Sequence, residues 1–312
     1  MMVVCMCECF HIQHKSKGIS FYRQIFFAVY RYEPVTGAFI SILLIPKLTD
    51  MKFILRFIIG CILLPACFST ANGQSARKLV WSDEFNYQGL PDPAKWGYDT
   101  GGHGWGNHEL QYYTNKESSN ARVEKGHLII EAKKENIGKN AHSSARLVTK
   151  GKGDWTYGRI DVRARLPKGL GTWPAIWMLG SKTPLKWPDD GEIDIMEHVG
   201  YNHGVVHASV HCRKYYHKIG TQKTATITVP DVSDSFHVYS LDWTAETITM
   251  LIDNKPYFTF SNEHTDRTAW PFDTPAYLLL NLAVGGDWGG QKGVDEKIFP
   301  QRMEIDYVRV YQ

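Results

Sequence analysis

The stretch Arg159-Ile160-Asp161-Val162-Arg163-Ala164-Arg165 decides the fold class, because charged and apolar residues alternate along it without a break. Side chains on a β-strand point to opposite faces in turn, so this pattern predicts a strand with one face in a core and one in water. Similar short runs recur at 79–85, 127–132, 157–166, 172–179, 192–199, 205–211, 236–243, 247–252, 276–284 and 303–311. Turn-rich stretches separate these runs, which is typical of an all-β sandwich or jelly roll.

Upstream of these runs, residues 51–73 have the order of a signal peptide. Met51 and Lys52 precede an apolar stretch, and small residues ending at Ala71-Asn72-Gly73 follow it. The uninterrupted apolar part, 57–64, is much shorter than the ~20 residues that span a bilayer. We therefore expect a secreted or periplasmic protein without a membrane span, whose mature domain covers residues 74–312.

Two features of the leader leave alternatives open. Residues 1–50 show no clear periodicity, so we interpret them as a gene-model extension ahead of a start at Met51, or as an unstructured leader. The stretch Leu64-Pro65-Ala66-Cys67 resembles a bacterial lipoprotein cleavage box, although Pro65 departs from the usual residue there. A lipid anchor through Cys67 is therefore the alternative to a free secreted protein.

Charge and cysteine content argue against nucleic-acid binding, an internal disulfide and a cysteine metal site. The formal net charge is only +3, too small to create a field that demands nucleic acid. Only Cys212 lies within the predicted domain, so a disulfide inside it is excluded and its core must stabilise it. Cys5, Cys7 and Cys9 lack the second cluster that a metal site of this type needs.

The carboxylates of Gly191-Glu192-Ile193-Asp194-Ile195-Met196-Glu197-His198-Val199 are the most informative feature for function. By simple alternation Glu192 and Asp194 share a face and Glu197 falls on the other. A β-bulge near Ile195 and Met196 would add one residue and return Glu197 to the first face. The structural alternative is a solvated strand face with scattered acids, which would need cross-strand arginines to offset the repulsion.

Three packed carboxylates suit the chemistry of glycoside hydrolysis. Neighbouring carboxylates push their pKa values apart, and a glycosidase needs one ionised and one protonated group at the same pH. A retaining enzyme holds the two carboxyl groups about 5–5.5 Å apart, so that one of them attacks the anomeric carbon. Two glutamates on one bulged strand can converge to that range.

The segment Glu192-Ile-Asp194-Ile-Met-Glu197 resembles the bulged signature of glycoside hydrolase family sixteen, and the following His198-Val199-Gly200 fits its laminarinase branch. Blocks in the expected order also resemble that branch, at 81–85, 109–113, 157–160, 166–169, 173–179, 280–286 and 306–311. The resemblance implies a β-jelly roll sandwich of two curved antiparallel sheets with a concave substrate groove. It also implies that Glu192 is the nucleophile, Glu197 the acid/base and Asp194 the assisting carboxylate.

Candidate groove residues follow from the same resemblance. Trp173 and Trp177 are four apart on a predicted strand and so share a face, and matching tryptophans line the groove in the family. His211 matches a groove histidine, whereas Cys212 and Tyr216 depart from the threonine and asparagine expected near it. We expect further sugar contacts from residues whose alternative role is structural, in the core or in an ion pair: Trp105, Asn107, Arg146 and Trp288.

The sequence gives no reason to invoke a metal in the chemistry. His207 and His211 are four apart on a predicted strand, where four residues span about 13 Å, too far for one zinc ion. Family members often carry a structural calcium ion, and Glu84, Gly126 and Asp306 occupy comparable positions. We therefore expect no cofactor for catalysis, and a structural calcium held partly by backbone carbonyls.

The resemblance implies a monomeric endo-acting hydrolase of β-1,3-glucan (laminarin), which also cuts mixed-linkage β-1,3-1,4-glucan in one version of the hypothesis. One alternative keeps the chemistry and changes the substrate to agarose, carrageenan or porphyran. Another is a glucan-binding protein without activity, although such relatives lack the catalytic glutamates that are present here. Transglycosylation in place of hydrolysis also stays open, because a covalent intermediate can react with sugar or water.

Overall fold

A computed structural model describes the backbone of residues 2–15 and 18–31 and the chain from 77 to 312. It divides into two compact units, 1–74 and 75–312. In the first unit, β1 (Met2–Lys15) pairs antiparallel with β2 (Gly18–Arg31), whereas the sequence showed no periodicity there. That residues 1–50 are a gene-model extension and are not translated stays a prediction. The expected signal peptide at 51–73 and its Cys67 lie outside the described residues.

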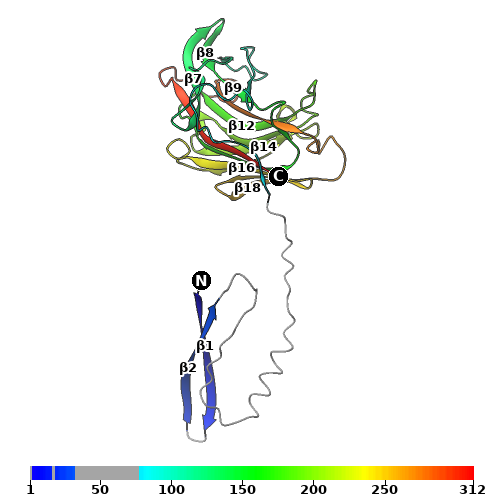
Figure 1. The fold of residues 1–312 in the computed structure, drawn as a ribbon. Helices are drawn as coiled ribbons and strands as arrows, with labels where there is room; N and C mark the ends of the chain where they lie inside the picture. The colour runs from blue at the N-terminus through cyan, green and yellow to red at the C-terminus, as the bar shows by residue number, and fades with distance from the viewer. Residues whose placement is uncertain (1, 16–17, 32–76) are drawn as a thin grey trace. The chain divides into compact units, whose positions relative to one another are not determined.

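The second unit is a sandwich of two sheets (Figure 1). The sheet that carries the predicted catalytic strand has the order β15-β14-β13-β12-β19-β9-β4, with β10 also paired to β19. Its strands are β4 (Gly97–Tyr98), β9 (Arg146–Val148), β10 (Asp154–Trp155), β12 (Thr172–Gly180), β13 (Glu192–His198), β14 (Val205–His211), β15 (Lys223–Thr228) and β19 (Ala276–Val284). We call it the catalytic sheet.

The second sheet, which we call the outer sheet, has the order β18-β17-β16-β11-β20-β7-β8-β5, with β3 on β20 and β6 on β7. Its strands are β3 (Leu79–Asp83), β5 (Gln111–Tyr113), β6 (Ala121–Glu124), β7 (His127–Ile137), β8 (Asn140–Ser144), β11 (Gly158–Arg165), β16 (His237–Trp243), β17 (Thr247–Ile252), β18 (Lys255–Ser261) and β20 (Gln301–Tyr311). The described strands pair antiparallel, except that β5 and β8 are parallel. The all-β prediction is confirmed.

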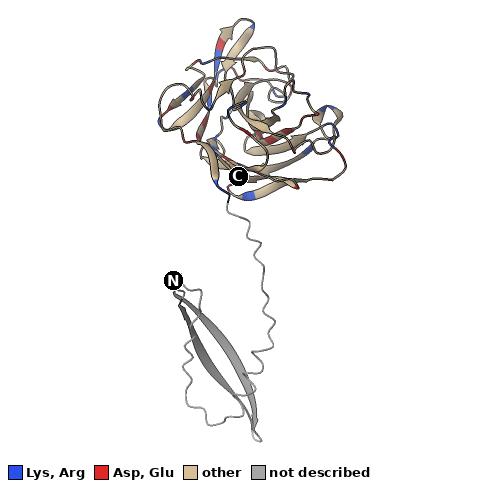
Figure 2. Ribbon diagram, turned by 45° about the vertical axis from the view of Figure 1, so that its right-hand side comes forward, with Lys and Arg blue, Asp and Glu red and all other residues tan. Residues whose placement is uncertain are grey.

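Alternation along the central strands builds the core between the sheets. Along β11, Ile160, Val162 and Ala164 are buried, while the intervening charged residues are half-buried on the opposite face. Those charged side chains form ion pairs, for example from Arg163 to Asp306 at 2.6 Å. Acidic and basic residues are interspersed along the ribbon of the second unit (Figure 2).

Strand β19 is buried along its whole length because both of its faces are covered. Leu278, Leu280 and Leu282 belong to the main core, whereas Leu279 and Ala283 belong to separate clusters on the other face of the catalytic sheet. We call this second face, opposite the core, the catalytic face.

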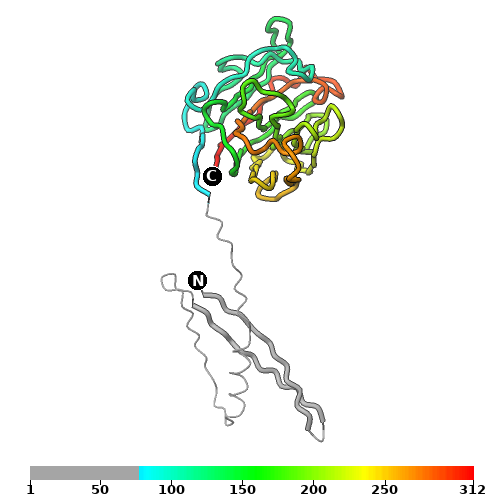
Figure 3. The backbone as a smooth tube through the Cα atoms, turned by 90° about the vertical axis from the view of Figure 1, so that its right-hand side faces the viewer, coloured from blue at the N-terminus to red at the C-terminus, as the bar shows by residue number. Residues whose placement is uncertain are grey.

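The two ends of the second unit lie side by side (Figure 3). Strand β3 pairs with the last strand, β20. Lys78 N donates to Gln312 O at 2.7 Å, and Gln312 N donates to Lys78 O at 3.0 Å. Two short 3₁₀ helices, η1 (Gly200–Asn202) and η2 (His217–Ile219), lie in loops around β14. Within the described residues, no helix has the length and apolar character to cross a membrane.

Candidate active site

The predicted bulge is present on β13. The residue pairs that join β13 to β12 skip Ile195, and the pairs that join it to β14 count one residue more on β13 between Asp194 and Glu197. Ile195 and Met196 are consecutive, yet both lie in the main core. The extra residue thus returns Glu197 to the catalytic face, because it shifts the alternation by one position.

Each of the two predicted catalytic glutamates accepts a hydrogen bond from a different indole. Trp173 Nε1, from β12, donates to Glu197 Oε1 at 3.0 Å. Trp187 Nε1, from the loop between β12 and β13, donates to Glu192 Oε2 at 2.8 Å. These bonds fix both carboxylates and favour their ionised forms, because a donor N–H stabilises negative charge.

His211 lies close to the carboxylates of Asp194 and Glu192. Its Nε2 is 3.2 Å from Asp194 Oδ2 and 3.8 Å from Glu192 Oε1. The histidine comes from β14, where it pairs in register with Glu192. The sequence-predicted position of His211 beside the catalytic strand therefore agrees with the structure.

Burial sets the protonation behaviour of the carboxylates. It raises the pKa of Glu192 to about 7, with a further contribution from the charge of Asp194. Burial also raises the pKa of Asp194 to about 8. The pKa of Glu197 rises well above its ordinary value, first through burial and then through the charge of Asp194. A carboxyl that stays protonated near neutral pH can act as a general acid, so the arrangement suits acid/base chemistry.

Trp177 is held on the catalytic face by a chain of hydrogen bonds. Its Nε1 donates to Asn281 Oδ1 at 2.7 Å, and Asn281 Nδ2 donates to Tyr113 OH at 3.0 Å. Tyr113 OH in turn donates to Glu109 Oε2 at 3.3 Å, and Gln111 Nε2 donates to the same oxygen at 2.6 Å. The chain fixes the orientation of an indole that the sequence placed in the substrate groove.

Arg146 is sandwiched between two tryptophans. Its guanidinium carbon lies 4.7 Å from the ring centroid of Trp105 and 4.7 Å from that of Trp177. Its Nε is 3.0 Å from Asp99 Oδ2. Such stacking is favourable and fixes the planes of both rings. Of the two roles considered for Arg146, these contacts match the structural ion pair, with the added function of orienting the two indoles.

The remaining predicted groove residues lie on two connected loops. Asn107 Nδ2 donates to Glu109 Oε1 at 3.3 Å, and Asn107 O accepts from Asp287 N at 2.7 Å. The neighbouring Trp288 packs edge-on against Trp173, with ring centroids 5.4 Å apart. Trp288 also packs against His207, at 4.9 Å. Trp288 therefore lies next to the tryptophan that binds Glu197.

Sequence reasoning missed four residues of this site: Trp187, Asn281, Glu109 and Tyr113. Trp187 lies in a loop outside any predicted strand, and its position five residues before Glu192 was the one available signal. Asn281 could have been noticed in the sequence, because it is an amide residue in the otherwise apolar run 276–284. Glu109 and Tyr113 stood inside a block that resembled the family, but nothing in the pattern assigned them a contact.

The three residues considered for calcium show a different arrangement. Arg309 donates to both carboxylate oxygens of Glu84, at 2.9 and 2.7 Å, and Asp306 accepts from Arg163. Gly126 has a positive φ of 79°, which a turn here requires. Both carboxylates are thus paired with arginines, which compete with a cation. Their side chains do not fit a calcium site, and binding through backbone carbonyls stays a prediction.

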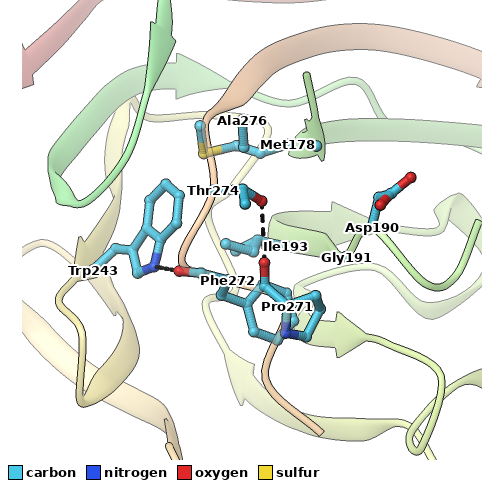
Figure 4. A pocket seen from close by; sticks show the side chains of 10 residues that line it. Met178, Asp190, Gly191, Ile193, Trp243, Pro271, Phe272, Thr274 and Ala276 are labelled. Atoms are coloured by element: carbon cyan, nitrogen blue, oxygen red, sulfur yellow. Dashed lines mark hydrogen bonds between the residues drawn. The ribbon is translucent and has the colours of Figure 1, made fainter. Parts of the chain in front are cut away.

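The start of the catalytic strand is fixed from behind by the core. A cavity of about 10 Å³ lies there, with room for a single water; it is lined by Ile193, Gly191, Phe272 and Trp243, among others (Figure 4). Trp243 Nε1 donates to Phe272 O at 3.0 Å. A Cβ at Gly191, whose φ is +84°, would lie 3.0 Å from the Phe272 ring. This packing holds the backbone just before Glu192.

Two half-buried glutamates on one face of a β-sandwich, each bound by an indole N–H, suit a glycoside hydrolase. The family model for glycosyl hydrolases family 16 matches residues 108–309, and the chain belongs to this family. The β-glucanase of Rhodothermus marinus is 54% identical over 268 residues, which cover 83% of this chain and 93% of that protein.

Solved structures agree with this assignment. The laminarinase of Rhodothermus marinus has a TM-score of 0.74 at 56% identity, covering 76% of this chain and 97% of that chain. A variant of SCLam, a non-specific endo-β-1,3(4)-glucanase with 1,3-β-D-cellobiosyl-glucose at its active site, has a TM-score of 0.74 at 48% identity. That match covers 76% of this chain and 95% of SCLam.

Proposed function

We propose that this glycoside hydrolase cleaves internal β-1,3 linkages of a laminarin-type glucan, and also mixed-linkage β-1,3-1,4-glucan, with retention of configuration. The observation that carries the proposal is the bulge at Ile195, which brings Glu192 and Glu197 to one face where each is held by its own indole. The similarity to a laminarinase and to a non-specific endo-β-1,3(4)-glucanase supports the substrate.

The family resemblance assigns the two glutamates their roles. Glu192 is the nucleophile, and in its ionised form, with a pKa of about 7, it attacks the anomeric carbon. Protonated Glu197 donates its proton to the departing glycosidic oxygen, and a glycosyl ester of Glu192 forms. Ionised Glu197 then takes a proton from water, which attacks the anomeric carbon and frees Glu192. Asp194 lies beside both and modulates their charge.

Aromatic side chains supply the binding surface of the proposed substrate site. Trp173 and Trp177 lie on the catalytic face, and indole rings offer flat partners for the apolar faces of sugars. The hydrogen-bond chain to Trp177 and the stacking of Arg146 orient this surface before substrate arrives. Rigid partners lower the entropy cost of binding.

We further propose that the protein is secreted or periplasmic, on the strength of the signal-like segment 51–73. We also propose that it acts as a monomer. Mass spectrometry of the expressed protein tests the proposal of secretion. A mature N-terminus near Gln74 supports it, a lipid-modified Cys67 supports the anchored form, and peptides from residues 1–50 would contradict a start at Met51.

The experiment that tests the activity is reducing-end release from laminarin, mixed-linkage glucan, agarose and carrageenan. The parent and its Glu192→Ser variant are compared side by side. Cleavage of laminarin by the parent alone supports the proposal. Cleavage of agarose or carrageenan in place of the glucans would overturn the substrate and keep the family, whereas binding of glucan without cleavage would overturn the enzymatic proposal.

Azide separates the roles of the two glutamates. In Glu197→Ala, azide replaces water as the second nucleophile and the product is the β-glycosyl azide. In Glu192→Ala, azide displaces the leaving group directly and the product is the α-glycosyl azide. Proton NMR distinguishes the two products, and the reverse pairing would show that the assigned roles are wrong.

A further inference from the structure

Glu192, Asp194 and His211 bring three metal-ligating atoms together on the catalytic face. One donor atom from each lies within 4.8 Å of the other two. His211 Nε2 is 3.2 Å from Asp194 Oδ2 and 3.8 Å from Glu192 Oε1. The ligands of a tetrahedral zinc ion, each about 2.1 Å from the metal, are about 3.4 Å from one another. The observed separations of 3.2 and 3.8 Å between the donor atoms are therefore close to those that a zinc ion needs.

The contact between His211 and Asp194 is not a hydrogen bond. The two atoms are close enough, but Asp194 Oδ2 has no aligned hydrogen-bond partner among the described residues. Asp194 is only 3% exposed and His211 only 6%. A buried polar atom without a partner is unfavourable, because it has lost its hydrogen bonds to water and gained none in return. A cation within reach of both atoms would satisfy Asp194 Oδ2, because the donor atoms of Asp194, His211 and Glu192 lie within 4.8 Å of one another.

The surroundings of Glu192 leave one oxygen free for such a cation. Trp187 Nε1 holds Oε2, whereas Oε1 is the oxygen directed toward His211. The Glu192 side chain is 16% exposed, so solvent reaches the site and can supply a water as fourth ligand. When both carboxyl groups are ionised they carry two negative charges, which a divalent cation balances.

We propose that Glu192, Asp194 and His211 form an inhibitory site for a borderline divalent cation, above all Zn²⁺. The imidazole nitrogen favours zinc over Ca²⁺ and Mg²⁺, which prefer oxygen ligands. The bound ion occupies the lone pair of Glu192 Oε1 and blocks attack on the anomeric carbon. This inhibition rests on the proposed role of Glu192, whereas the binding of the ion does not. His207, the other histidine considered as a zinc ligand from the sequence, is not a ligand in this proposed site.

Zinc binding is measured directly by titrating ZnCl₂ into the unit 75–312 in a calorimeter. This unit contains the whole described core, and its match covers 97% of a solved laminarinase chain, so it folds without the leader. It also lacks the leader cysteines, so the measured zinc binding belongs to the domain alone. We expect one ion per domain, and at least about tenfold weaker binding in Glu192→Gln and in His211→Asn.

The matched control is His264→Asn, which removes an exposed histidine paired with Glu246 elsewhere on the domain. It should bind zinc as the parent does. Unchanged affinity in both Glu192→Gln and His211→Asn, or a loss in His264→Asn, would overturn the proposal. Circular dichroism checks that the variants are folded.

Inhibition kinetics need no variant. Zinc should raise the apparent KM for laminarin, more laminarin should relieve the inhibition, and EDTA should reverse it. Inhibition that laminarin does not relieve would place the ion elsewhere and refute the site. A parent that releases no reducing ends even without metal would contradict the proposed function instead, and the calorimetric result would still decide whether the ion binds.

Discussion

Replacing Trp187 by phenylalanine should shift the acidic limb of the pH profile of kcat/KM upward by about one pH unit. The substitution removes the 2.8 Å hydrogen bond from Nε1 to Glu192 Oε2 and keeps an aromatic ring in place. A hydrogen bond to a charged group is typically worth about 1.5–3 kcal/mol, and 1.36 kcal/mol corresponds to one pKa unit. Taking about 1.5 kcal/mol, the low end for a partly hydrated site, gives a rise of about one unit.

The sign follows from which form the indole stabilises. The N–H favours the ionised carboxylate, so its loss raises the pKa of Glu192 from about 7 toward about 8. Glu192 must be ionised to attack, so activity is lost as the pH falls through this pKa. The parent should therefore lose kcat/KM below about pH 7, and Trp187→Phe below about pH 8.

Trp173→Phe is the matched control, because it removes the same kind of bond from Glu197. Glu197 must be protonated to donate, so a rise in its pKa moves the basic limb upward and leaves the acidic limb in place. Initial rates on laminarin at a series of pH values measure both limbs. The reasoning is refuted if both variants move the same limb, or if neither limb moves while the rates fall.

Three further predictions concern stability, register and binding. Glu192→Gln should raise the melting temperature at pH 8 by several degrees and hardly change it at pH 4.5. A carboxyl whose pKa is raised to about 7 destabilises the folded state progressively as the pH rises from about 4.3, its ordinary value, to about 7, and the cost is complete above that. An equal effect at both pH values in differential scanning fluorimetry would contradict the role of ionisation. Deleting Ile195 should remove the bulge, leave Glu197 on the catalytic face of a regular strand and keep measurable laminarin hydrolysis. Deleting Ile193 should turn Glu192 away from that face and abolish laminarin hydrolysis. Inactivity of both folded variants would count against the bulge argument. Asn281→Ala should raise KM about tenfold with little change in kcat, because it frees the indole of Trp177; steady-state kinetics that show a loss in kcat alone would rule this out.

Patterns with a period of two could be predicted because they depend on local alternation. The predicted runs at 205–211, 247–252 and 276–284 coincide with β14, β17 and β19. The bulge could also be predicted, since three carboxylates at 192, 194 and 197 share a face only if one residue is added between them. Trp173 and Trp177 followed from the same alternation.

Edge strands and loop contacts could not be predicted in this way. Strands β15 and β18 lie at the sheet edges, where exposed polar residues weaken the hydrophobic pattern. Pro256 lies within β18 although it reads as part of a turn, because an edge strand tolerates a missing N–H. Trp187 reaches Glu192 from a loop, and loop paths depend on tertiary packing that single-residue patterns do not contain.

The pairing of β3 with β20 means that the catalytic domain is nearly a closed ring of polypeptide. Lys78 and Gln312 exchange two backbone hydrogen bonds, so a short peptide could join the two ends. New ends could then be opened at the tight turn of Asp253 and Asn254, between β17 and β18, without disturbing β12 to β14. Because the two ends are adjacent, a linker fused to the N-terminal end and one fused to the C-terminal end would leave the domain at the same place on its surface. Either fusion would therefore present the active site in the same orientation.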